Sequence, residues 1–347
     1  MTTSISDILL HWYDKHARQL PWRNPPGAAT PWDPNWPYRV WLSEVMLQQT
    51  TVAAVKPYFE KFTQTWPSVD ALAAASDDEI MAAWAGLGYY SRARNLARCA
   101  REVAAMGAFP STESELAKLP GLGAYTAAAI AAIAFGERAV VVDANVERVV
   151  ARLFNISEPL PSARKVIRCG ADEITPHDRA GDFAQAMMDL GSQICTSKAP
   201  RCLLCPLAEC CAARKGGQPE SLPVKPAKKA KPERQGTAFW IEREAAAGRE
   251  VWLITRPDRG MLGGMRALPD DGWSARKDGS GGLSGAEIAA TLGAVRHTFT
   301  HAHLTLSLVR IEDGYEPSGQ GEWWAVDRLD EAGLPTLFAK AVRLALA

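Results

Sequence analysis

Glu44 is the only charged residue between Val40 and Thr51, in a run that reads VWLSEVMLQQTT. If the segment 38–51 is a helix, the neighbours of Glu44 one turn away include Trp41 and Leu47, which are apolar. Burying a carboxylate there is costly, so the pKa of Glu44 should rise and make this residue a general acid near neutral pH. The alternative is a helix-surface glutamate that points to water.

Asp143 is placed differently, after the apolar run AVVV and before ANVERVVARLF, which has the periodicity of a helix. Free backbone N–H groups and the helix dipole favour a negative charge at such a position, so we expect Asp143 to stay ionised. An ordinary helix N-cap would have the same sequence. As a pair, a protonatable carboxyl and a persistent carboxylate provide what is needed to break a glycosidic bond through an oxocarbenium-like state.

The residues before Asp143 predict two helices joined by a tight turn. STESELAKL is helical, with Ser111 or Thr112 as its cap, and the following PGLG places Gly121 and Gly123 where the backbone must bend. The Ala-rich stretch 124–134 is a strong helix former. Backbone N–H groups at the start of that helix can bind a phosphate without any basic side chain. A glycine turn between helices can also be purely structural.

Five of the seven cysteines lie between Cys195 and Cys211. Such clustering, in a chain that shows no export signal, favours metal binding over disulfides. Taking Cys195, Cys202, Cys205 and Cys211 as ligands gives the spacing C-x6-C-x2-C-x5-C. Four thiolates at this spacing can hold zinc or an iron–sulfur cluster, and Cys210 is an alternative fourth ligand.

The charge balance and the hydropathy of the chain exclude some classes of protein. The 39 basic residues are matched by 39 acidic ones, so any binding to nucleic acid must use local patches and helix N-termini rather than bulk charge. No apolar run approaches 18 residues, which argues against a membrane span. The N-terminal residues form an amphipathic pattern, with Ile5, Leu9 and Trp12 on one helical face, rather than a signal-peptide core.

The length of 347 residues allows two or three domains. We expect a helical domain over 1–212, a basic, proline-rich linker over 213–234 and a small α+β domain over 235–347. Helix periodicity marks 38–64, 76–85, 91–106, 113–118, 124–135, 144–154 and 181–194. Strands are expected in TAFWIERE, EVWLITRP, RHTFTHAHLTLSLVRI and GEWWAVDRL, and a short helix over Ser284–Leu292.

Several of these segments together resemble the MutY-type adenine DNA glycosylases of the helix-hairpin-helix superfamily. They are WPYRVWLSEVMLQQTTVAAVKPYFEKF, WAGLGYYSRARNL, LPGLGAYTAAAI, VVVDANVERV and FAQAMMDLGSQIC. The resemblance covers most of the chain. It implies a mainly α N-terminal helix-hairpin-helix glycosylase domain with a four-Cys cluster loop and a small α+β Nudix-like C-terminal domain. It also implies that Cys195, Cys202, Cys205 and Cys211 hold a [4Fe–4S] cluster.

The resemblance also assigns catalytic roles. Glu44 would protonate the adenine at N7, and Asp143 would stabilise the sugar carbon that becomes positive, supported by Tyr125 and Asn145. Endonuclease III relatives that also cut the strand have a lysine at the position of Tyr125, whose amine forms a Schiff base. The phenol at this position therefore predicts a monofunctional glycosylase that leaves an abasic site.

Removing a base from duplex DNA requires extruding it into a pocket. The resemblance implies an adenine pocket made of Trp22, Arg23, Leu47 and Gln185, although the segment 23–36 is longer and richer in proline than we expect for the family. The DNA contacts that it implies are made by Gln48, Gln49, Leu87, Tyr89, Gly121 and Gly123, with Phe299, Thr300 and His301 inspecting 8-oxoguanine. In this last triplet, threonine replaces the serine of the family.

The expected function is removal of adenine opposite 8-oxoguanine or G in double-stranded DNA, as part of base excision repair. The resemblance implies a monomeric, bacterial-type cytoplasmic enzyme that associates with the nucleoid while it scans DNA. Alternatives are a glycosylase for thymine or uracil in mismatches and a non-catalytic mismatch-binding protein. A Nudix hydrolase is excluded, because SGAEIAATLGAV supplies one glutamate where that chemistry needs a run of them on a helix.

Overall fold

The computed structural model describes residues 4–29, 33–226, 230–246, 248–257 and 260–347. Its chain divides into two compact units, one formed by Met1–Ala75 with Asn95–Ala227 and the other by Ser76–Arg94 with Lys228–Ala347. Among the described residues, no helix is both long enough and apolar enough to cross a membrane.

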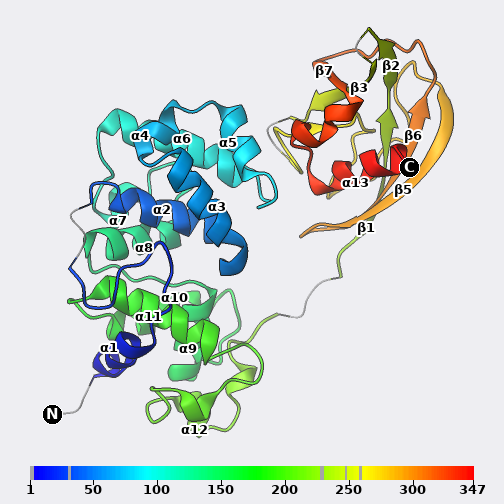
Figure 1. Cartoon of the computed structure of the whole chain (residues 1–347). Coiled ribbons are helices and arrows are strands. Elements are labelled where there is room, and N and C mark those ends of the chain that lie inside the picture. The colour runs from blue at the N-terminus through cyan, green and yellow to red at the C-terminus, as the bar shows by residue number, and fades with distance from the viewer. Residues whose placement is uncertain (1–3, 30–32, 227–229, 247, 258–259) are drawn as a thin grey trace. The chain divides into compact units, whose positions relative to one another are not determined.

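The first unit is helical, and α8 lies at its centre between α2 and α11 (Figure 1). Its helices are α1 (Ile5–His16), α2 (Trp36–Leu47), α3 (Val52–Thr65), α4 (Val69–Ala74), most of α6 (Ser91–Met106), α7 (Glu113–Leu116), α8 (Ala124–Phe135), α9 (Ala144–Leu153), α10 (Arg164–Ile174), α11 (Ala180–Gln193) and α12 (Ala212–Lys215).

Close helix packing in this unit depends on small residues. Seven residues of α8, from Thr126 to Ala132, are buried, and five of them are alanines, so neighbouring backbones can approach closely. At Gly181 of α11, a Cβ atom would lie 2.5 Å from the carbonyl oxygen of Ala132 and 2.9 Å from Cα of Ile133. These are backbone atoms, so they cannot move away by a change of rotamer.

Several predicted helices are confirmed, among them 91–106 and 124–135, but the single helix expected over 38–64 is wrong. The chain leaves the helix after Leu47, and Gln49 has a left-handed φ of 57°. Thr51 then caps α3, because its side chain accepts a hydrogen bond from the N–H of Ala54. Polar residues that end one helix and start the next override the continuous periodicity.

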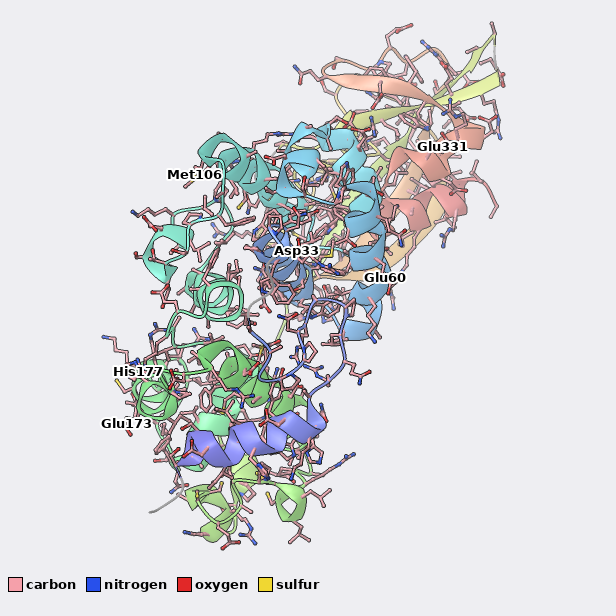
Figure 2. All side chains as sticks on the ribbon, turned by 60° about the vertical axis from the view of Figure 1, so that its left-hand side comes forward. Asp33, Glu60, Met106, Glu173, His177 and Glu331 are labelled. Atoms are coloured by element: carbon pink, nitrogen blue, oxygen red, sulfur yellow. The ribbon has the colours of Figure 1, made fainter. Side chains whose placement is uncertain are left out.

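In this unit α4, α10 and the short α12 were not predicted, and neither was the last helix of the second unit, Thr336–Ala345. α10 is amphipathic, since Ile167, Ala171 and Ile174 are buried whereas Glu173 points outward, as does His177 just beyond the helix (Figure 2). For α1, the face that is buried contains Leu9 as expected, whereas Trp12 is only partly buried.

The first half of the predicted linker 213–234 packs on the helical unit instead of forming a free tether. Leu222 is buried, and its carbonyl oxygen accepts a hydrogen bond of 3.0 Å from Nε of Arg152. The N–H of Leu160 donates to the carbonyl oxygen of Val224 at 2.8 Å. Strand β1 (Glu233–Trp240) begins before the expected boundary at 235. The basic composition was therefore a poor guide to where ordered structure stops.

The second unit contains α5 (Asp77–Trp84) and two sheets. In the first sheet β6 (His303–Ile311) lies between a parallel β1 and an antiparallel β5 (Ile288–Thr298). In the second, β3 (Gly248–Thr255) pairs antiparallel with β2 (Glu242–Ala245), β4 (Arg266–Ala267) and β7 (Gly321–Ala325). Helix α13 (Thr336–Ala345) packs on β5, and its Phe338 joins Trp240 and Leu306 in the core.

The helix expected over Ser284–Leu292 is wrong, because this stretch leads into β5. Ala-rich sequence favours a helix locally, but β5 is paired with β6 along its whole length, with bulges between Ile288 and Ala290 and between Thr291 and Gly293. The φ of Gly293 is 140°, which is incompatible with a helix. Pairing with β6 therefore outweighs the local helix preference of this stretch.

We predict that Gly181→Ala destabilises the helical unit by about 1–3 kcal/mol, because the new Cβ overlaps with the backbone of α8. Gly216→Ala is the control, since its Cβ would lie 3.6 Å from the nearest neighbouring atom, the carbonyl oxygen of Ala212. The free energy of unfolding, measured by urea titration, should fall for the first variant and stay near the wild-type value for the second. Equal stabilities of the two variants would contradict this account of the packing.

Candidate active site

Glu44 lies on α2, is 6% exposed, and accepts a hydrogen bond of 2.7 Å from the hydroxyl of Tyr125, the second residue of α8. Burial raises the pKa of the Glu44 carboxyl above its ordinary value. The hydrogen bond from Tyr125 and the charge of Arg23 act in the opposite direction but do not outweigh burial. The surface alternative for Glu44 is therefore wrong, and burial favours the protonated form of its carboxyl.

Tyr125 is partly buried, and desolvation followed by the nearby charge of Glu44 raises the pKa of its phenol well above the ordinary value. The phenol therefore remains a neutral hydrogen-bond donor. It cannot act as an anionic nucleophile near neutral pH, but it can fix the orientation of the Glu44 carboxyl.

Asp143 is the N-cap of α9 and is held by backbone and side-chain donors. Its Oδ1 accepts hydrogen bonds from the N–H groups of Asn145 at 2.9 Å and Val146 at 2.7 Å, and its Oδ2 accepts one from Nδ2 of Asn145 at 2.8 Å. Three donors and the start of a helix stabilise a negative charge on this carboxylate and fix its orientation.

The two carboxylates line the same two cavities, one of about 750 Å³ and one of about 220 Å³, together with Leu47 and Tyr125. The larger cavity is also lined by Gln48, Gln49, Gly121 and Gly123. The smaller one is also lined by Trp22, Arg23, Asn145 and Gln185. The structure thus brings the predicted base pocket and the hairpin glycines together around one pair of acids.

The hairpin between α7 and α8 leaves donors free for a ligand. Gly121 has a left-handed φ of 77°, and a Cβ there would lie 2.7 Å from Cβ of Asn95, so this turn requires glycine. Gly123 is the N-cap of α8, and no side-chain hydrogen bond caps this helix within the described residues. The first N–H groups of α8 can therefore bind an anion.

The remaining predicted DNA contacts belong to the second unit. Leu87 is buried, whereas Tyr89 is 46% exposed and has a left-handed φ of 49°. Tyr89 lines a cavity of about 580 Å³ together with Phe299, Thr300 and His301, which form the turn after β5. The ring of Phe299 packs against that of His297, with centroids 4.5 Å apart.

Sequence reasoning missed an ion pair behind the smaller cavity. Asp189 of α11 is fully buried, and its carboxylate accepts hydrogen bonds from Nε of Arg18 at 2.6 Å and from a guanidinium nitrogen of Arg23 at 2.8 Å. The signal was present in AQAMMDLG, where one carboxylate interrupts an apolar helix face as Glu44 does in α2.

Arg148 of α9 connects the capped carboxylate to the cysteine loop. Its guanidinium donates to Oδ1 of Asn145 at 3.0 Å, to the carbonyl oxygen of Gly191 at 2.6 Å and to that of Cys195 at 2.7 Å. Gly191 is tightly packed, because a Cβ there would lie 2.6 Å from Cβ of Asn145. The loop and α11 therefore help to fix the position of Asn145.

Four cysteines surround a cavity of about 30 Å³, namely Cys195, Cys202, Cys205 and Cys211. Cys210 is exposed and is not among the residues that line this cavity, so the structure favours Cys211 as the fourth member. Buried Arg152 donates a hydrogen bond of 3.3 Å to Sγ of Cys195. Four thiols turned toward one space, with an arginine to balance their charge, form a donor set that fits a thiolate-bound metal centre.

Family models match two parts of the chain. Residues 42–170 match the HhH-GPD superfamily of base excision DNA repair proteins, and residues 237–344 match the NUDIX domain. The structure of a thermostable thymine-DNA glycosylase is similar to the chain, with 28% identity and a TM-score of 0.53. The similarity covers 61% of this chain and 95% of that one.

Two curated relatives specify the class of DNA glycosylase. The adenine DNA glycosylase of Homo sapiens is 33% identical, over 99% of this chain and 74% of the human protein. The adenine DNA glycosylase of Mycolicibacterium smegmatis is 40% identical, over 60% of this chain and 69% of that protein. The chain belongs to the adenine DNA glycosylase family.

We predict that Cys211→Ser lowers the metal content of the purified protein to a small fraction of the wild-type value, because it removes one of the four thiols around the cavity. Cys210→Ser, the same change at the preceding residue, should leave the metal content unchanged. Iron and zinc are measured by mass spectrometry on protein purified without oxygen. Loss of metal in Cys210→Ser and not in Cys211→Ser would reverse the ligand assignment.

Proposed function

We propose that the protein is a monofunctional DNA glycosylase that excises adenine opposite 8-oxoguanine or G, in base excision repair. The observation that carries this proposal is the pairing of a buried Glu44, hydrogen-bonded to Tyr125, with a capped Asp143 on the walls of the same cavities. Family membership supplies the choice of adenine as the base.

The first task of the site is to make adenine a leaving group. Glu44, whose pKa is raised by burial, donates its proton to a ring nitrogen of the extruded base, which by family resemblance is N7. The electron pair of the breaking C1′–N9 bond then moves into a neutral adenine rather than an anionic one. Tyr125 keeps the carboxyl of Glu44 oriented while the proton is transferred.

The second task is to stabilise the sugar. As the bond breaks, positive charge develops at C1′, and the fixed carboxylate of Asp143 stabilises that charge. Asn145 holds this carboxylate in one orientation. Water adds to C1′, and its proton passes to the Glu44 carboxylate that the first step left ionised, which leaves an abasic site and an intact strand.

No amine is available for strand cleavage among the residues that line the two cavities, since none of these described residues is a lysine. A Schiff base to C1′ requires such an amine, and Tyr125 has a phenol instead. This supports hydrolysis without lyase activity.

DNA binding would combine the hairpin and the second unit. The free N–H groups at the start of α8 fit a phosphate, and the side chains of Gln48 and Gln49 line the same cavity. The turn of Phe299, Thr300 and His301 would inspect the base opposite adenine. Its exposed threonine hydroxyl and histidine ring are hydrogen-bonding groups able to read 8-oxoguanine.

A [4Fe–4S] cluster is the metal centre that we propose for the four cysteines. Within the described part of the chain, no three cysteine, histidine or carboxylate side chains are placed to hold a single metal ion, yet four thiols line one cavity. Four thiolates can hold either zinc or such a cluster, and the family resemblance favours the cluster. When bound, the cluster would cross-link the loop and supply neither acid nor base to the reaction.

We predict that a duplex with one A:8-oxoguanine pair, after reaction with the wild type, shows a strand break only when it is treated with alkali. Glu44→Gln and Asp143→Asn should each slow excision by about 100-fold or more, because they remove the proton donor and the stabilising charge. Single-turnover assays with and without alkali measure both points. Strand breaks without alkali would refute the monofunctional assignment, and release of thymine or uracil instead of adenine would move the protein to another glycosylase class.

We predict that Thr300→Ala reduces the preference for A:8-oxoguanine over A:G by roughly tenfold, since one lost hydrogen bond is worth about 1.4 kcal/mol. Thr291→Ala is the control, because Thr291 is also exposed but lies in β5 away from the turn. The ratio of single-turnover rates on the two duplexes is measured. An unchanged ratio in Thr300→Ala would remove this residue from 8-oxoguanine recognition.

A further inference from the structure

Asp189 is the one fully buried carboxylate among the described residues, and its side chain binds two arginines that line the same cavity as Glu44. Its carboxylate accepts from the backbone N–H of Arg18 at 3.1 Å and from the side chain of that residue at 2.6 Å. It also pairs with Arg23 at 2.8 Å. Both arginines line the cavity of about 220 Å³ that contains Glu44.

The charges around Glu44 come from several elements. The groups that act on Glu44 are Tyr125 of α8, Arg23 from the segment before α2, and Asp143 at the start of α9. Arg23 in turn interacts with Asp189 of α11 and Tyr13 of α1. Arg18 lines the same cavity as Glu44 and also interacts with Tyr13. Arg23 is a positive charge that acts on Glu44, and by itself it favours an ionised Glu44.

We propose that Asp189 is a positioning residue for base excision, which fixes Arg18 and Arg23 at the wall of the base pocket and offsets one of their two positive charges so that Glu44 can carry its proton. This inference rests on the proposed function. The geometry supports it, because the side chain of Arg23 is only 7% exposed and a buried guanidinium needs a counter-ion. Glu44 would otherwise serve as that counter-ion and would lose its proton.

The same contacts have a consequence for base recognition. With its carboxylate bound to both arginines, Asp189 limits the rotamers that they can adopt. Two fixed guanidinium groups give the pocket hydrogen-bond donors of defined direction, and a purine ring nitrogen is an acceptor that they can reach. Loss of Asp189 should therefore affect both the ionisation of Glu44 and the placement of the base.

The test is the pH dependence of single-turnover adenine excision in Asp189→Asn, measured from about pH 5 to about pH 9. Activity needs protonated Glu44, so the rate falls as pH rises through the pKa of Glu44. Removing the charge of Asp189 lowers the pKa of Glu44, so the decrease in rate should occur about one pH unit lower than in the wild type. At pH values above the pKa of Glu44, the rate of the variant should be roughly tenfold lower than that of the wild type. Asp189→Glu keeps the negative charge, so its excision rate should decrease at the same pH as that of the wild type.

Asp182→Asn is the matched control, because Asp182 is also an α11 carboxylate paired with an arginine, Arg179 at 2.8 Å, but does not line the cavity. Its pH profile should match that of the wild type. If circular dichroism shows that Asp189→Asn does not fold, Arg18→Gln combined with Asp189→Asn removes one charge of each sign and still leaves Arg23 without its carboxylate.

The outcomes separate the two proposals. A wild type that releases no adenine at any pH would overturn the proposed function and this inference with it. An active wild type whose pH profile is unchanged in folded Asp189→Asn, or in the double variant, would overturn this inference alone. A profile that moves in Asp189→Asn but not in Asp189→Glu or Asp182→Asn would support it.

Discussion

Two carboxyl groups on one cavity can take different roles only if the protein gives each a different environment, and the packing of the helical unit provides this difference. Glu44 is held on a buried helix face and receives one hydrogen bond, from Tyr125. Asp143 is held at the start of α9, where backbone donors stabilise its charge. Because the environments differ, two acids of similar intrinsic pKa can take opposite roles.

Helix packing brings these environments together. α8 supplies Tyr125 for Glu44 and also the free N–H groups beside the hairpin, and its alanines allow α2 and α11 to approach it closely. α11 in turn supplies Asp189 behind the base pocket and leads into the cysteine loop. Through Arg148, the loop is connected to Asn145 and so to the carboxylate of Asp143. The site is therefore a property of four packed helices and not of one motif.

Local signals in the sequence were sufficient to predict the strongest helices, the hairpin and both carboxylates, because capping, glycine turns and a charge in an apolar run are short-range features. They were insufficient where distant partners decide. Pairing with β6 makes a strand of the Ala-rich stretch before Gly293, and only three-dimensional placement separates Cys210 from Cys211. Asp189 was missed because its partners are more than 160 residues away in the sequence.

The close approach at Gly191 has a consequence for how the sequence can vary. A residue with no side chain makes no chemical contribution, yet even one added methyl group there would displace Asn145, which orients Asp143. Gly191 should therefore tolerate substitution as poorly as Asp143, whose orientation depends on it through Asn145. Inherited or random changes at Gly191 should therefore abolish repair while leaving every chemically active side chain of the site in the gene product.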